Sequence, residues 1–155
     1  MKLSARTHSM VQVLLDLELH REGDSSLTLK VIAQRQGISH AYLEQMMIPL
    51  IAGGIIRSIR GPKGGVVLTK PAEDINLKEI VEILEDATDP VECLVNAKIC
   101  PRSRLCASRE IWGEMKTAID RVFVCTTLQD LAERQKNKEK IESMYYIKII
   151  KSINK

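Results

Sequence analysis

The sequence predicts a mainly α-helical fold that contains one small β-hairpin. Apolar residues recur at helical spacing before residue 55, two short β-branched segments follow with a glycine-rich turn between them, and helical patterns fill most of the remainder. A length of 155 residues suits one domain with an appendage. Because 45% of the residues are apolar and 28% are charged, the composition excludes a disordered or collagen-like chain.

Three helices are predicted at the start of the chain. Apolar residues recur at helical spacing over 4–21. Thr28 can cap a short second helix, which Gly37 ends, and Ser39 can cap a third helix, which ends at Gly53. Two short helices joined by a glycine-containing turn are typical of a helix-turn-helix.

A β-hairpin is predicted directly after the third helix. Residues 55–60 and 66–69 form short segments rich in β-branched side chains. The turn between them reads Gly61-Pro62-Lys63-Gly64-Gly65. A hairpin in this place is a wing, so the order of elements predicts a winged helix-turn-helix, with a further helix over 77–86 packed beneath it.

The third helix carries side chains suited to the major groove of DNA. Gln45 can bond adenine through two hydrogen bonds, whereas Glu44 can only accept, for example from the amino group of cytosine. Glu44 would therefore reject wrong bases more than it adds affinity. The alternative is an ordinary solvated helix face. The predicted DNA-binding residues are Ser39, His40, Tyr42, Glu44, Gln45, Arg60, Lys63 and Gly64.

Pro49 lies within the apolar pattern of this third helix. Proline lacks a backbone donor and its ring clashes with the carbonyl of Gln45, so we expect a kink or an early end after Met46. The side chains that would read bases precede this point, so the DNA-binding prediction does not depend on it.

Charge is distributed unevenly along the chain. Residues 1–70 carry nine Lys and Arg against five Asp and Glu, residues 71–135 carry eight against thirteen, and residues 136–155 carry six against two. A basic module joined to an acidic one is typical of a protein that binds a polyanion, although ordinary surfaces also fluctuate in this way. In the DNA-binding interpretation, Arg60 and Lys63 of the wing meet phosphates or enter the minor groove.

Two classes of protein are excluded by patterns that the sequence lacks. No apolar run approaches the roughly 18 residues of a membrane span, so we expect a soluble, cytoplasmic protein without a membrane partner. The sequence shows no nucleophile–base group, no phosphate-binding glycine loop and no acidic pair at a useful spacing. We therefore expect no enzymatic activity.

Cys93, Cys100 and Cys106 lie in the segment 87–106, which has no convincing helical or strand period. A structureless segment of about twenty residues is unusual unless something holds it, and a metal or cluster bound by three sulfurs would do so. Nearby Lys and Arg side chains favour the thiolate form that binds metal. Three cysteines alone also suit free thiols or a disulfide, which are the alternative. Their spacing differs from the two-residue pair typical of structural zinc sites. Cys125 lies among apolar residues and is expected to be a small buried side chain.

Four sequence motifs and the cysteine spacing form a recognisable combination. The motifs are Met1-Lys2-Leu3-Ser4, Arg35-Gln36-Gly37-Ile38-Ser39, Tyr42-Leu43-Glu44-Gln45 and Arg60-Gly61-Pro62-Lys63-Gly64-Gly65, and Trp112 follows the three cysteines. Over roughly residues 1–135 the chain resembles the IscR family of iron–sulfur winged-helix transcription regulators, whose relatives include the nitric-oxide sensor NsrR and the cysteine-metabolism regulator CymR.

The resemblance implies a homodimer that binds double-stranded DNA and is joined by a long helix, here over about 107–124. It also implies that the three cysteines are ligands of an iron–sulfur cluster, a [2Fe–2S] cluster by the nearest match and a [4Fe–4S] cluster as the alternative. The residues themselves agree with a dimer, because an apolar stripe on this helix would stay partly exposed in a lone subunit. The stripe consists of Ile111, Met115, Ile119 and Val122.

The resemblance leaves the fourth cluster ligand open. Close IscR relatives have a histidine three residues after the last cysteine, where this chain has Arg109, which cannot ligate. His8 is a candidate, because a residue at the matching position of NsrR-type relatives reaches the cluster from the partner subunit. Its alternative is a polar residue on the first helix. Glu92, Cys125 and a small exogenous ligand are the other candidates.

These inferences predict a DNA-binding transcription regulator that senses an iron–sulfur cluster, by resemblance one that governs cluster biogenesis genes. The alternatives are a zinc- or thiol-redox-responsive regulator and a cluster-free, CymR-like regulator that acts through a protein partner. The expected parts are a winged helix-turn-helix at 1–86, a cysteine loop at 87–106, a dimerisation helix and a following short helix at 107–135, and a basic tail at 136–155. The tail is expected to be either flexible or helical.

Overall fold

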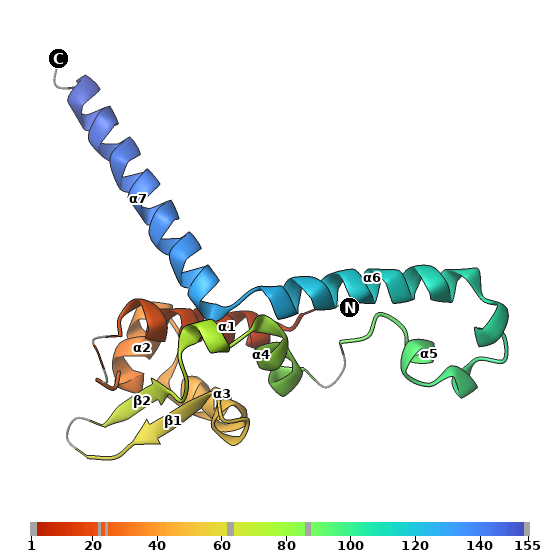
Figure 1. The fold of residues 1–155 in the computed structure, drawn as a ribbon. Helices are drawn as coiled ribbons and strands as arrows, with labels where there is room; N and C mark the ends of the chain where they lie inside the picture. Colours follow the sequence, from red (N-terminus) through yellow and green to blue (C-terminus); the bar gives the residue numbers. More distant parts are fainter. Residues whose placement is uncertain (1–2, 22, 24, 62–63, 86–87, 154–155) are drawn as a thin grey trace.

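The computed structural model describes residues 3–21, 23, 25–61, 64–85 and 88–153, with side chains up to residue 145. Figure 1 shows a winged helix-turn-helix at the base, an arm formed by one long helix, and a final helix that projects away from the wing. The predicted fold class, mainly helical with one hairpin, is confirmed.

Three capped helices open the chain. A side-chain oxygen of Ser4, Thr28 or Ser39 accepts a hydrogen bond from the backbone amide three residues further on, as N-cap residues do. Gly37 ends the second helix at φ 64°, a left-handed conformation that favours glycine. The helices are α1 (Ala5–Leu19), α2 (Leu29–Gln36) and α3 (His40–Ala52).

Pro49 does not end α3, so the early end expected after Met46 is wrong. The helix continues to Ala52, and the amide of Gly53 donates to the Pro49 carbonyl at 2.8 Å. The adjacent side chains of Met47 and Leu50 are buried, so tertiary packing holds this last turn despite one missing helical hydrogen bond.

The wing consists of the antiparallel strands β1 (Ile56–Ile59) and β2 (Gly65–Leu68), in register from Ile56 opposite Leu68 to Ile59 opposite Gly65. Leu27 adds a single bridge to the free edge of β2. Its amide donates to the Val66 carbonyl at 3.1 Å, and the Val66 amide donates back at 2.9 Å. The segment before the helix-turn-helix therefore fixes the base of the wing.

The hydrophobic core is completed from the far end of the chain. After the short turn η1 (Ala72–Asp74), helix α4 (Leu77–Leu84) packs beneath α3, as expected. Helix α7 (Leu128–Ile153) then returns to α1 and buries Leu128 and Ala132 in the same core. The folded unit therefore includes residues beyond the predicted boundary at 86.

The cysteine segment and the C-terminal segment are more helical than predicted. The former contains α5 (Glu92–Val95) and the turns η2 (Ala97–Ile99) and η3 (Ser103–Leu105), followed by the arm helix α6 (Ala107–Cys125). The latter is not a short helix plus a tail, because α7 spans 26 residues without interruption. Within the described residues, no helix is both long and apolar enough to cross a membrane.

Candidate functional site

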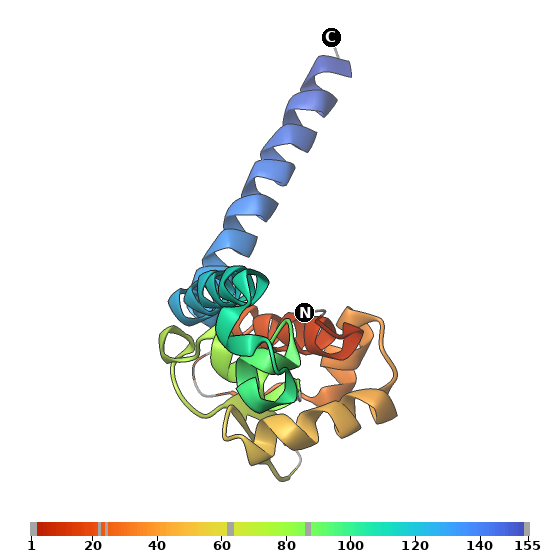
Figure 2. The ribbon, with the colours of Figure 1, turned by 90° about the vertical axis from the view of Figure 1, so that its right-hand side faces the viewer.

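The solvent-facing side of α3 presents the predicted base-reading residues. The side chains of His40 and Glu44 are 50% and 57% exposed, and Gln45 and Tyr42 are exposed as well. The opposite side of the helix is held by four buried apolar residues, so packing fixes the helix without using this face. Figures 1 and 2 place α3 and the wing on the side of the domain opposite α7. The buried residues are Leu43, Met46, Met47 and Leu50.

His40 and Glu44 lie one helical turn apart and face each other. The distance from Nδ1 of His40 to Oε1 of Glu44 is 3.6 Å, so a protonated imidazole would form an ion pair with the carboxylate. With His40 protonated, the pair would neutralise part of the negative charge that Glu44 presents on this face.

The wing turn requires glycine at position 64, because it has no space there for a side chain. The Gly64 amide donates to the Gly61 carbonyl at 2.8 Å, and Gly61 has φ 112°. A Cβ atom on Gly64 would lie 2.7 Å from the carbonyl oxygens of Gly61 and Ile59, which is closer than real contacts allow. Gly64 therefore shapes the turn. Arg60 is exposed beside it, and Lys63 lies outside the described residues.

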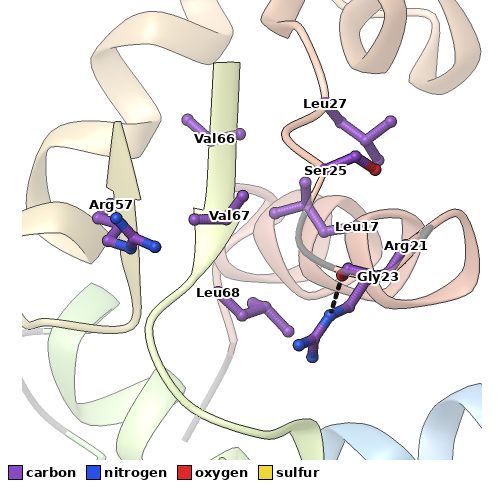
Figure 3. A pocket seen from close by; sticks show the side chains of 9 residues that line it. All are labelled: Leu17, Arg21, Gly23, Ser25, Leu27, Arg57, Val66, Val67 and Leu68. Carbon is purple, nitrogen blue, oxygen red and sulfur yellow. Dashed lines mark hydrogen bonds between the residues drawn. The ribbon is translucent and has the colours of Figure 1, made fainter. Parts of the chain in front are cut away.

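A small cavity lies behind the wing, between the end of α1, the segment 23–27 and β2 (Figure 3). Its volume of about 50 Å³ has room for a few water molecules and is far below that of a typical ligand pocket, several hundred Å³. Arg21 Nε donates to the Gly23 carbonyl at 3.0 Å at its rim. The cavity is therefore smaller than a typical ligand pocket.

A buried carboxylate joins α1 to the helix-turn-helix, and the sequence interpretation missed it. The Asp16 side chain is 6% exposed, and its Oδ2 lies 2.9 Å from Nη2 of Arg35 on α2. No donor in the described part of the chain is aligned to hydrogen-bond this oxygen, so the contact is an ion pair. Nδ1 of His20 lies 3.3 Å from the other oxygen. An acidic residue inside the apolar stripe of a helix was the available signal.

The three predicted cluster ligands lie on successive turns of one loop at the far end of the arm (Figure 1). Cys93 is in α5, Cys100 follows η2, and Cys106 precedes α6. All three are free thiols and half-buried. The loop therefore offers three sulfur donors from a single segment.

Protein contacts order this loop, so its length alone does not require a metal. The Ser103 hydroxyl donates to the Ala97 carbonyl at 2.8 Å. Arg109 bonds both ends of the cysteine series, because its amide donates to the Cys106 carbonyl at 3.1 Å and its Nε donates to the Cys93 carbonyl at 3.0 Å. Arg109 thus holds together the backbone at the first and last cysteines.

Charged side chains attach the loop and the arm to α4. Lys116 Nζ of α6 lies 3.3 Å from Asp89 and 3.0 Å from Asp120, and Lys78 of α4 lies 3.3 Å from Asp120. The hydrogen bond to Asp120 raises the pKa of Lys116. Partial burial favours the neutral acid at Asp120, but hydrogen bonds from Lys116 and Lys78 outweigh it and lower the pKa of Asp120.

Glu85 joins α4 to the start of α1, just before the cysteine segment. Its Oε1 accepts hydrogen bonds from the amide and the hydroxyl of Ser4, both at 2.8 Å, and from the hydroxyl of Thr7. The Thr7 and Ser4 hydrogen bonds lower the pKa of Glu85 below its usual value. The positive end of the α1 dipole also stabilises the negative charge of this carboxylate.

The donor set of the loop fits an iron–sulfur cluster in its chemistry, because cysteine thiolates are the usual cluster ligands. In the described residues of one chain, no group of three or more His, Cys, Asp or Glu side chains is arranged to hold a single metal ion. The three thiols therefore offer suitable donor atoms without converging on a single ion within the described residues of one chain.

Among the described residues of one chain, neither His8 nor Cys125 is grouped with the cysteines as a metal site. His8 is exposed on α1, beside a hollow lined by Gln12, Gln36 and Ile38. Cys125 is exposed, and the prediction that it is buried is wrong. It ends a helix on which none of the described residues is buried in a single chain.

Comparison with known proteins agrees with this architecture. Residues 3–134 match the Rrf2 family, described as iron-dependent transcriptional regulators. The protein rrf2 of Nitratidesulfovibrio vulgaris is 41% identical over 131 residues, which are 84% of this chain and 87% of that protein. The structure of CymR, the global cysteine regulator of B. subtilis, superposes with a TM-score of 0.73 at 34% identity, over 86% of this chain and 98% of CymR. T. potens IscR gives a TM-score of 0.69 at 30% identity, over 87% of this chain and 88% of IscR.

Proposed function

The chain belongs to the Rrf2 family of transcriptional regulators, and from this we propose that it is a homodimeric operator-binding protein whose cysteine loop carries an iron–sulfur cluster. We propose a [2Fe–2S] cluster, with [4Fe–4S] as the alternative form. The observation that carries the cluster proposal is the set of three free, half-buried thiols on one loop. Proteins of this family regulate transcription and are not enzymes.

In this proposal, α3 reads bases and the wing holds the phosphate backbone. Gln45 pairs with adenine, and Glu44 accepts only from a base that offers a donor. Arg60 and Lys63 supply contacts that set the position of the protein on the duplex rather than its sequence preference. Such phosphate contacts make the affinity fall as salt rises.

The proposed dimer forms along α6. Ile111 and Val122 are 58% and 60% exposed, and Trp112 is 40% exposed on the same helix. Large apolar side chains left exposed along one helix in this way indicate an interaction site. A second copy would cover this stripe, and two copies would present two α3 helices to two half-sites.

Cys93, Cys100 and Cys106 would hold the cluster, which supplies a redox- and iron-dependent centre when bound. Arg109 would keep the backbones of the first and last cysteine together. The loop in turn contacts α6 and, through Asp89, the ion-pair network on α4. The proposed regulation is a linkage, in which cluster binding favours one arrangement of the two DNA-binding domains and so changes operator affinity.

Operator binding with and without the cysteines tests this function. The wild-type dimer, purified without oxygen, and the variant with all three cysteines replaced by serine are compared on the same promoter duplexes. The proposal expects different footprints for the two proteins and the same footprint for the variant and chelator-treated wild type. Identical footprints for all three would leave a DNA-binding protein without cluster sensing.

A cluster-free regulator that acts through a protein partner is the second candidate. The observation that favours it is the likeness to CymR, with a TM-score of 0.73 over 98% of that chain. This candidate expects colourless protein that contains no iron and whose operator binding is unchanged by the three serine substitutions. The same comparison therefore separates the two candidates.

A further inference from the structure

The recognition face of α3 ends in an exposed isoleucine that the proposed function does not use. Ile48 is 64% exposed, although its neighbours Met47 and Leu50 are buried. Ile51, one turn further along, is 42% exposed. A helix whose inner face already packs the core thus continues its outer face with large apolar side chains.

Ile48 is in register with the predicted base-reading residues. The exposed positions Ala41, Glu44, Gln45 and Ile48 follow one another at offsets of 0, 3, 4 and 7 residues. The recognition helix of homeodomains presents base-contacting residues to the major groove at the same offsets. Because α3 continues as a helix through Pro49, Ile48 stays on this face.

The major groove offers one apolar feature to such a side chain. Thymine carries a methyl group at C5, which cytosine and uracil lack, and apolar side chains recognise thymine through it. The γ and δ carbons of isoleucine have no hydrogen-bonding group, so they cannot read a donor or an acceptor. Among base features, they suit only that methyl group.

We propose that Ile48 is a specificity residue that contacts a thymine methyl group in each half-site of the operator. This inference rests on the proposed function, because it requires α3 to lie in the major groove. It adds a second kind of reading to the face, since Glu44 and Gln45 select through hydrogen bonds and Ile48 selects through apolar contact.

Replacement of thymine by uracil isolates the methyl group. The full-length dimer selects its best duplex from a random-sequence library, and that duplex is resynthesised with deoxyuridine in place of thymidine, one position at a time. Affinities are measured for wild type, Ile48→Ser and Ile51→Ser. Both substitutions change exposed residues and leave the core intact.

We expect one thymine in each half-site at which uracil weakens wild-type binding about fourfold, the value of one buried methyl group. Ile48→Ser should bind the thymine duplex and the uracil duplex with equal affinity. Ile51→Ser should show the same difference in affinity between them as wild type. Insensitivity of wild type to every uracil, or an undiminished difference in Ile48→Ser, would overturn the inference while DNA binding stands. If no duplex is selected, the proposed function fails and the inference fails with it.

Discussion

Substitution of Arg35 by glutamine should destabilise the chain, because it removes the ion pair that links α1 to α2. Arg35 is the cation that lies 2.9 Å from the carboxylate of Asp16, whose side chain is only 6% exposed. Removal of one partner from a fully buried pair costs about 3–5 kcal/mol, because the other charge is left without compensation. The Arg35 side chain is 30% exposed, and His20 stays 3.3 Å from Asp16. The solvent exposure and the nearby imidazole both reduce the stability that is lost when Arg35 is removed.

We therefore expect Arg35→Gln to lower the free energy of unfolding by about 2–3 kcal/mol. For a chain of this size, the melting temperature would fall by about 4–12 °C. Urea unfolding followed by circular dichroism measures the change directly. The double variant with Asp16→Asn should lose less than the sum of the two single losses, because the two side chains interact.

Lys136→Gln is the matched control for the loss of one positive charge. Lys136 is exposed on α7, and such surface changes usually alter stability by less than about 0.5 kcal/mol. If Arg35→Gln lost no more than this control, the Asp16–Arg35 contact would not hold α2 against α1. Additive losses in the double variant would lead to the same conclusion.

Three further predictions concern selectivity, the cluster and pH. Glu44→Ala should raise affinity for random duplexes and weaken discrimination at one base pair about fivefold, measured by binding competition. Replacement of Cys93, Cys100 and Cys106 together by serine should abolish visible absorbance and leave measurable DNA binding. Glu85→Gln should lower stability at neutral pH, and its deficit relative to wild type should shrink as the pH falls through the lowered pKa of Glu85.

Each of these predictions has an opposing result. Unchanged selectivity in Glu44→Ala would remove its role as a discriminator. Full absorbance in the triple serine variant would assign the chromophore to other residues. The Glu85 contribution is present above the unfolded-state pKa of a glutamate and is lost on acidification, so a deficit that grew at low pH would contradict it. Glu82→Gln, on the exposed side of α4, is the control.

The helix-turn-helix and the wing could be predicted because their signals are local. Capping residues, apolar spacing and the glycine-rich turn depend on neighbours in the sequence, and the second and third helices begin at the predicted caps Thr28 and Ser39. The end of α3 could not be predicted from Pro49, because packing of buried neighbours decides whether a turn survives a lost hydrogen bond.

The contacts of the cysteine loop could not be predicted, because they join residues that are distant in the sequence. Arg109 was interpreted only as a missing ligand, yet it bonds the backbone of Cys93, sixteen residues earlier. Cys125 lies among apolar neighbours, which favoured burial, but it is exposed at the end of α6, a helix on which no described residue is buried within one chain. Local composition cannot show which helix faces are covered by other parts of the fold.

An ultraviolet–visible spectrum of the dimer isolated under nitrogen, combined with iron and acid-labile sulfide analysis, tests the cluster proposal most directly. The proposal predicts coloured protein in which iron and sulfide are present in equal amounts and disappear together on exposure to a chelator and oxygen. Colourless protein with intact thiols, after expression with ample iron, would contradict it.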